Sequence, residues 1–83
     1  MIEKQELEAY RIAQESMTGL KLAVRMLLKD DVELSNAEIG RKLGIYAGHK
    51  GHDGHISRTV LAMLEAEGFV SQDDASKLWK QRQ

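Results

Sequence analysis

The chain of 83 residues contains neither cysteine nor proline. Without cysteine it can form no disulfide framework and no thiolate zinc site. It also lacks an uncharged apolar stretch long enough to span a bilayer, and its opening residues, MIEKQELEAY, lack the apolar core of a signal peptide. We therefore expect a cytoplasmic protein with no membrane partner.

Catalytic signatures are missing as well. The sequence contains no nucleophile elbow and no Walker-type phosphate loop, and its carboxylates cluster at expected helix ends and turns, where capping accounts for them. A chain of this length forms one small domain with a modest core. We expect no enzymatic activity and no bound cofactor.

The charged side chains are distributed in blocks. The formal net charge is −1, which does not by itself indicate nucleic-acid binding. Residues 30–38 carry acidic charges alone, whereas residues 39–60 carry four basic side chains against one acidic, a balance of +3, and residues 76–83 carry three basic side chains, again +3. Two basic patches separated by an acidic one are compatible with a DNA-binding face and also with an unevenly charged solvated surface.

Residues 3–16 are predicted to form a helix. Apolar side chains recur in it at intervals of three and four, at Leu7, Tyr10, Ala13 and Met17. Gly19 weakens a helix interior, so a second helix is expected over residues 20–29, although one bent helix fits the same pattern. Since the first helix is acidic on balance, it is a poor DNA contact. Its apolar stripe needs cover from the domain or from a second copy, and we favour a homodimer.

A short helix is expected over residues 36–43. Ser35 is a good N-cap, and Glu38 three residues later completes a capping box. Gly44 follows in the position of a C-terminal glycine. The next stretch, IYAGHKGHDGH at residues 45–55, repeats a Gly-His pair three times and is predicted to be a loop or a strained short helix.

The segment between Gly54 and Gly68 is predicted to be an amphipathic helix, residues 55–67, capped by Asp53 or Gly54. Its inner face is expected to hold Ile56, Val60, Met63 and Leu64, with Leu61 at the edge. The opposite face is expected to hold His55, Arg58, Thr59 and Ala62, with Ser57 nearer the boundary.

A small hairpin is expected to follow, with strands at residues 69–72 and 77–80 around the turn at 73–76. Trp79 is expected to pack in the core or on the hairpin, because a small domain needs large apolar side chains. Four helical segments and a C-terminal hairpin make the predicted fold mostly α.

Three stretches resemble the winged helix-turn-helix superfamily of DNA-binding domains: LSNAEIGRKLGI at 34–45, HISRTVLAMLEAEGFV at 55–70 and the hairpin through KLWK at 77–80. The first resembles a positioning helix and the second a recognition helix that runs into the wing. The resemblance implies a three-helix core plus wing over residues 19–83. Residues 1–18 exceed what a minimal winged helix needs, and their apolar stripe makes them the expected dimerisation element. The usual turn between the two helices is about three to four residues long, and here about ten separate Leu43 from His55.

Three interpretations of the Gly-His loop are open. Glycine N–H groups at a helix N-terminus can bind phosphate, with Lys50 and the histidines as further donors. His49, His52 and His55, together with Asp53, have a spacing that can ligate zinc or nickel, although no distant fourth ligand is obvious. The loop can also be purely structural. Because histidine titrates near neutral pH, phosphate contact there would make DNA binding depend on pH.

The resemblance and the basic blocks together give the expected function, sequence-specific binding of double-stranded DNA by a small transcriptional regulator, with the helix at 55–67 in the major groove. Arg58 is the principal candidate for a base or phosphate contact, and a surface ion pair to Glu65 or Asp53 is the alternative. The alternative functions are a winged-helix protein-interaction module and an RNA-binding winged helix. The candidate DNA contacts are Arg41, Lys42, His49, Lys50, His52, His55, Ser57, Arg58, Thr59, Lys77 and Lys80.

Overall fold

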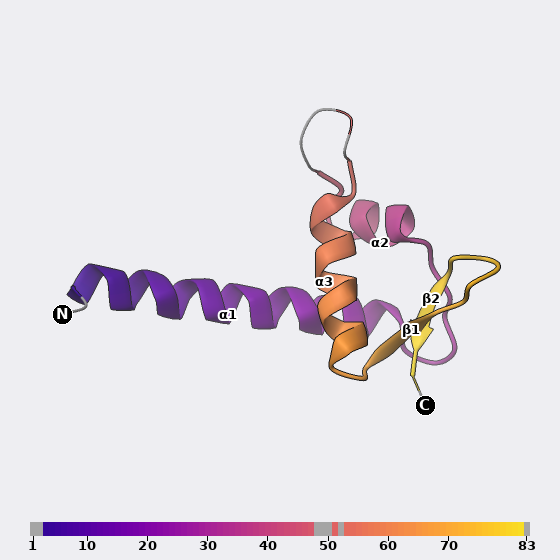
Figure 1. Cartoon of the computed structure of the whole chain (residues 1–83), viewed down its shortest axis with the longest axis horizontal. Helices are drawn as coiled ribbons and strands as arrows, with labels where there is room; N and C mark the ends of the chain where they lie inside the picture. Colours follow the sequence, from indigo (N-terminus) through magenta and orange to yellow (C-terminus); the bar gives the residue numbers. More distant parts are fainter. Residues whose placement is uncertain (1–2, 48–50, 52, 83) are drawn as a thin grey trace.

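The computed structural model describes residues 3–47, 51 and 53–82. Over those residues the chain forms three helices and a two-stranded antiparallel sheet, in the order α1 (Lys4–Leu27), α2 (Asn36–Lys42), α3 (His55–Ala66), β1 (Val70–Gln72) and β2 (Trp79–Gln81). Helix α1 is a long rod, and the other elements gather around its C-terminal half (Figure 1). The described residues include no helix that is long and apolar enough to cross a membrane.

Helix α1 is continuous, so three helices replace the four predicted segments, and the boundary expected at residues 18 and 19 lies inside one helix. Glycine in a helix interior costs about 1 kcal/mol relative to alanine. Met17 and Leu20, on either side of Gly19, both pack against the core. Packing on both sides of the glycine stabilises the helical path more than the glycine weakens it.

The core lies where α1, α2, α3 and the hairpin meet. Every element contributes to it, through Val24, Leu28, Ile39, Val60, Leu61, Leu64, Val70 and Trp79. The burial of Trp79, which is 6% exposed, confirms the prediction that it is a packing residue. The core holds only the second half of α1, because no described side chain before Met17 belongs to it or packs against it.

Helix α2 begins and ends as its local sequence predicts. The backbone N–H of Glu38 donates to Ser35 Oγ at 3.1 Å, and the backbone N–H of Ser35 donates to Glu38 Oε1 at 2.9 Å, which together form the capping box. Gly44 has a φ of 71°, the left-handed conformation that glycine tolerates best.

The connection before α2 pairs with the hairpin through Leu34. Leu34 and Trp79 form an antiparallel bridge, in which the N–H of Leu34 donates to the carbonyl of Trp79 at 3.0 Å and the N–H of Trp79 donates back at 2.7 Å. This bridge, which the sequence did not predict, attaches the start of α2 to the second strand of the hairpin.

Helix α3 is rotated relative to the prediction. Its buried side chains are Ser57, Val60, Leu61 and Leu64. Ile56, expected in the core, is 43% exposed, and Met63 is only half-buried. The reason is the close approach of α2, because a Cβ built on Gly40 would lie 3.0 Å from Ser57 Oγ. A glycine opposite a serine brings these two helices together on the Ser57 side of α3.

The hairpin pairs Val70 with Gln81, Ser71 with Lys80 and Gln72 with Trp79. Both strands are shifted relative to the prediction, because Phe69 precedes the first strand and Lys77 belongs to the turn. Lys77 has a φ of 65°, and its carbonyl accepts a hydrogen bond from Gln72 Nε2 at 3.1 Å. The turn is fixed at its start by Asp73, whose carboxylate accepts from the N–H of Ser76 at 2.7 Å.

Candidate nucleic-acid interface

Along its centre, the outward face of α3 carries mostly short side chains and no lysine, arginine or carboxylate, and we call it the low face. At 3.6 residues per turn, four exposed residues stand opposite the buried ones: His55, Thr59, Ala62 and Ala66. Two of these are alanines, so a partner surface can approach the helix backbone closely. The B-DNA major groove is about 12 Å wide and admits one α-helix, for which a low outer face is suitable.

Arg58 lies beside this low face, one turn into the helix, and is exposed. In the part of the chain that the structure describes, Arg11 and Lys21 form side-chain ion pairs, whereas the Arg58 guanidinium has no hydrogen-bond or ion-pair partner. The expected alternative, an ion pair with Glu65 or Asp53, is therefore not formed. The charge of Arg58 and its planar set of donors are available to a ligand.

Two hydroxyl groups expected on the DNA face are engaged elsewhere. Ser57 is fully buried and its Oγ donates to the carbonyl of Gly54 at 3.1 Å, so the prediction that it contacts DNA is wrong. Thr59 is exposed, but its Oγ1 donates to the carbonyl of His55 at 2.9 Å. A hydroxyl has a single donor hydrogen, so Thr59 in this rotamer can only accept. It can therefore contact a base amino group but not a phosphate oxygen.

The start of α3 is anchored on one backbone oxygen. Gly54 has a φ of 86°, and its carbonyl accepts from the N–H of Arg58 at 3.0 Å, from Ser57 Oγ at 3.1 Å and from Asn36 Nδ2 at 3.2 Å. Gly54 is thus the N-terminal cap, one of the two residues predicted for it. Because Asn36 is the first residue of α2, this bond joins the starts of the two helices.

Tyr46 fills the space between α2 and α3. A Cβ on Gly40 would lie 2.9 Å from Tyr46 Cδ1, and a Cβ on Gly54 would lie 2.7 Å from Tyr46 Cε1, so both positions require glycine for the ring to fit. Neither Asn36 nor Tyr46 was predicted from the sequence to belong to this site. Gly40 could have indicated the packing of a side chain against α2, because a glycine inside a helix often marks the close approach of another segment.

The two basic residues of α2 are both exposed but differ in their surroundings. The Arg41 guanidinium stacks over the Tyr46 ring at 4.6 Å from its centroid, whereas Lys42 extends from the last turn of the helix. Stacking holds the Arg41 charge beside the α2–α3 junction. The pKa of Glu38 is lowered, chiefly by the N–H and then by the hydroxyl of Ser35, so the first turn of α2 carries a carboxylate that disfavours phosphate there.

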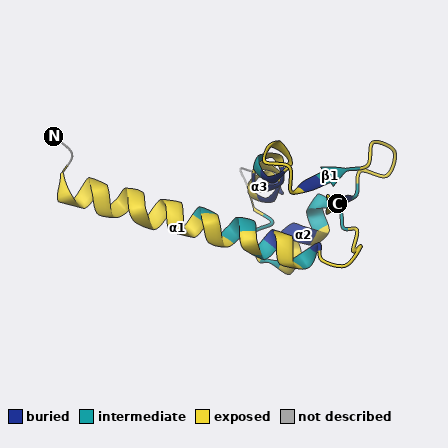
Figure 2. Ribbon diagram, turned by 90° about the horizontal axis from the view of Figure 1, so that it is seen from below, coloured by how far each residue is buried: buried dark blue, intermediate teal, exposed yellow. Residues whose placement is uncertain are grey.

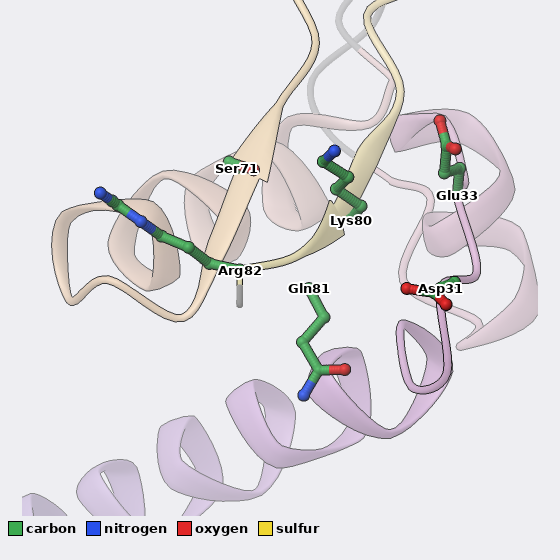
Figure 3. Close-up of a pocket in the computed structure, with 6 residues that line it drawn as sticks. All are labelled: Asp31, Glu33, Ser71, Lys80, Gln81 and Arg82. Atoms are coloured by element: carbon green, nitrogen blue, oxygen red, sulfur yellow. The ribbon is translucent and has the colours of Figure 1, made fainter.

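The hairpin supplies Lys77, Lys80 and Arg82, all exposed. Lys80 and Arg82 border a hollow of about 380 Å³ that is also lined by Asp31 and Glu33. Figure 3 shows the two carboxylates on the connection before α2, across the hollow from the strand that carries Lys80. These carboxylates offset the positive potential around Lys80, so Lys77 in the turn is the better placed cation for a phosphate.

Three residues of the predicted DNA contacts, His49, Lys50 and His52, lie outside the described residues. Of residues 48–55, the structure therefore describes Gly51, Asp53, Gly54 and His55, and His55 is exposed at the first turn of α3. Within the described ranges no group of three histidine, cysteine or carboxylate side chains is arranged to hold a metal ion. Phosphate contact and metal binding by the loop both stay predictions.

Comparison with known proteins adds no relative. No family model, no curated protein and no solved structure matches the chain. The described arrangement, with three helices followed by an antiparallel hairpin, is compatible with a winged helix.

Proposed function

We propose that this chain is a winged-helix protein that binds double-stranded DNA sequence-specifically, as a small transcriptional regulator, with α3 in the major groove. The observation that carries the proposal is Arg58, an exposed guanidinium without a partner among the described residues, beside the low face formed by His55, Thr59, Ala62 and Ala66. A free guanidinium on a helix that can approach a groove closely is suited to a bidentate contact with guanine.

The surrounding cations support the same face. Arg41 and Lys42 on α2, which packs against α3, and Lys77 in the hairpin turn are all exposed. Contacts of this kind to phosphates position a protein on DNA without reading its sequence. His49, Lys50, His52 and Lys80 complete the proposed phosphate contacts.

The anchored start of α3 supports sequence-specific rather than merely electrostatic binding. A base contact requires the reading side chain to be held in a narrow range of positions relative to the groove. Arg58 follows Gly54 by one turn, and the Gly54 carbonyl is bonded to both α2 and α3. The position of Arg58 is thereby linked to that of Arg41 and Lys42.

Fluorescence anisotropy with random-sequence duplex DNA at two salt concentrations tests the proposal. We expect micromolar binding at low salt that collapses at higher salt, because bound cations displace counterions from the phosphates. Arg58→Ala should weaken binding and lower the salt dependence by about one counterion. Lys29→Ala, which removes an equal charge from the loop after α1, is the matched control and should have little effect.

A selected binding site then separates base reading from phosphate contact. Arg58→Ala should weaken the free energy of binding to that site by about 1–3 kcal/mol. Arg58→Lys should retain binding to random-sequence DNA but lose most of the discrimination between DNA sites. A folded protein that fails to bind at low salt, or an Arg58→Ala variant indistinguishable from Lys29→Ala, refutes the proposal.

The second candidate function is a protein-interaction module that does not bind DNA. The specific observation in its favour is the exposed apolar surface of α1, where Leu7 and Tyr10 are 60% and 64% exposed. Such a module would associate through apolar contact and would respond weakly to salt. The same salt titration therefore distinguishes the two functions.

A further inference from the structure

The first half of α1 is a helix without tertiary contacts. All residues from 3 to 16 are exposed, and Figure 2 shows this half projecting away from the rest of the molecule. Isolated helices of about 12–15 residues are marginal in water. Arg11 pairs with Glu8 at 2.6 Å and with Glu15 at 2.8 Å, but exposed pairs of this kind contribute only about 0.3–0.5 kcal/mol each. The side chains of Leu7 and Tyr10 are exposed, without cover from the other described residues.

Two hollows lie on one side of α1, one in each half. The first, about 550 Å³, is lined by residues that include Leu7 and Tyr10. The second, about 220 Å³, is lined by residues that include Leu22, Arg25 and Phe69. Leu7, Arg11, Gln14, Thr18 and Arg25 line these hollows and follow one another at intervals of four, three, four and seven, the spacing of a single helix face that can pair with another helix.

The two halves of α1 carry opposite charge. Within the helix, residues 4–16 contain three acidic and two basic side chains, a balance of −1, whereas residues 17–27 contain two basic side chains and no acidic one, a balance of +2. Both of these cations are already held beside the second hollow. Lys21 is paired with Glu67 at 2.7 Å, and the Arg25 guanidinium stacks on the Phe69 ring at 3.9 Å.

We propose that two copies of this chain pair through antiparallel α1 helices, with the acidic first half of each helix against the basic second half of the other. This pairing brings Leu7 and Tyr10 of one copy onto Leu22 and Phe69 of the other, twice by symmetry. A parallel pair would place like charges against each other. The chain thus supplies both complementary surfaces, which makes a second copy the occupant.

The interface is modest. Its length is bounded by α1, whose 24 residues span about 36 Å. One helix face and the adjacent Phe69 place it at the small end of specific interfaces, so we expect a dissociation constant on the order of micromolar. The pairing does not depend on DNA binding and is measured without DNA.

Sedimentation equilibrium of the full chain tests the pairing. Tyr10→Ser should weaken the dimer at least tenfold, and high salt should weaken it too, because the opposed charges contribute to the contact. The matched control is Ile12→Ser, since Ile12 is 52% exposed but lies on another side of α1. Both residues are exposed, so circular dichroism should show unchanged folding. A monomer at several hundred micromolar, or equal effects of the two variants, overturns the proposal.

The orientation is tested with spin labels, which the absence of native cysteine makes straightforward. Lys4→Cys places a label at the start of α1 and Lys29→Cys places one just beyond its C-terminal end, so the two sites are separated by about the 36 Å length of the helix. In an antiparallel dimer, a mixture of the two labelled variants gives short distances, and each variant alone gives long ones. A short distance between two labels at residue 4 overturns the antiparallel arrangement.

Discussion

Replacement of Gly54 by alanine should destabilise the domain through two separable effects. The first is conformational, because a φ of 86° costs a residue with a side chain about 1–2 kcal/mol. The second is steric, because the added Cβ would lie 2.7 Å from Tyr46 Cε1 and 2.8 Å from Asn36 Nδ2. Forcing such a contact in a packed region typically costs about 1–3 kcal/mol. Gly54→Ala should therefore lower the free energy of unfolding by about 2–5 kcal/mol.

Gly68 provides the matched control for this prediction. It has a φ of 85°, but a Cβ there would meet nothing within 4 Å. Gly68→Ala should show the conformational cost alone. The difference between the two variants, about 1–3 kcal/mol, measures the contact with Tyr46 and Asn36.

Urea denaturation followed by circular dichroism gives both free energies. A domain of this size has a total stability of only about 4–12 kcal/mol, so Gly54→Ala is expected to approach the limit of folding, and low temperature or a stabilising salt will be needed. Equal destabilisation by Gly54→Ala and Gly68→Ala would refute the argument that Tyr46 and Asn36 are packed against this glycine. A much larger loss for Gly68→Ala would do the same.

Two further predictions concern charge. The pKa values of Glu38 and Asp73 are both lowered, chiefly by the N–H groups of Ser35 and Ser76 respectively, so these carboxylates stabilise the fold above the ordinary carboxyl pKa of the unfolded chain. We expect this stabilisation to be complete above about pH 5 and to disappear as the pH falls below about 4, in urea titrations at a series of pH values. Lys77→Ala should weaken DNA binding more than Lys80→Ala, because carboxylates border the hollow beside Lys80. Anisotropy titrations check this order, and the reverse order contradicts the proposed placement of the hairpin on phosphate.

The features that the sequence predicted correctly have local causes. The capping box at Ser35 and the left-handed Gly44 involve residues only a few positions apart, so the sequence pattern specifies them directly. The hairpin was predicted from turn residues in the same way, and its strands were misplaced by one or two residues because Lys77 adopts a left-handed conformation within the turn. The exposure of Arg58 was also predicted correctly from the helical period.

The features that were missed depend on contacts between distant segments. Gly19 suggested a helix break, but packing of Met17 and Leu20 on the core outweighs its low helix propensity. The rotation of α3, and with it the burial of Ser57, depends on the glycine of α2 that faces it. Helical periodicity identifies an apolar face only to within one residue position, and here the neighbouring helix determines which residues that face includes.

The junction at Tyr46 also has a consequence for how this domain tolerates change. Tyr46 follows α2, Gly54 caps α3, and the ring of the first residue lies against the backbone of the second. This contact joins the two positions directly, so the placement of α3 on α2 depends on residues outside the sequence between them. We expect a change in the length of that sequence to cost little conformational entropy and to leave α3 in place. A graft there would change what the domain presents beside its candidate DNA-binding helix and would leave the helix itself in place.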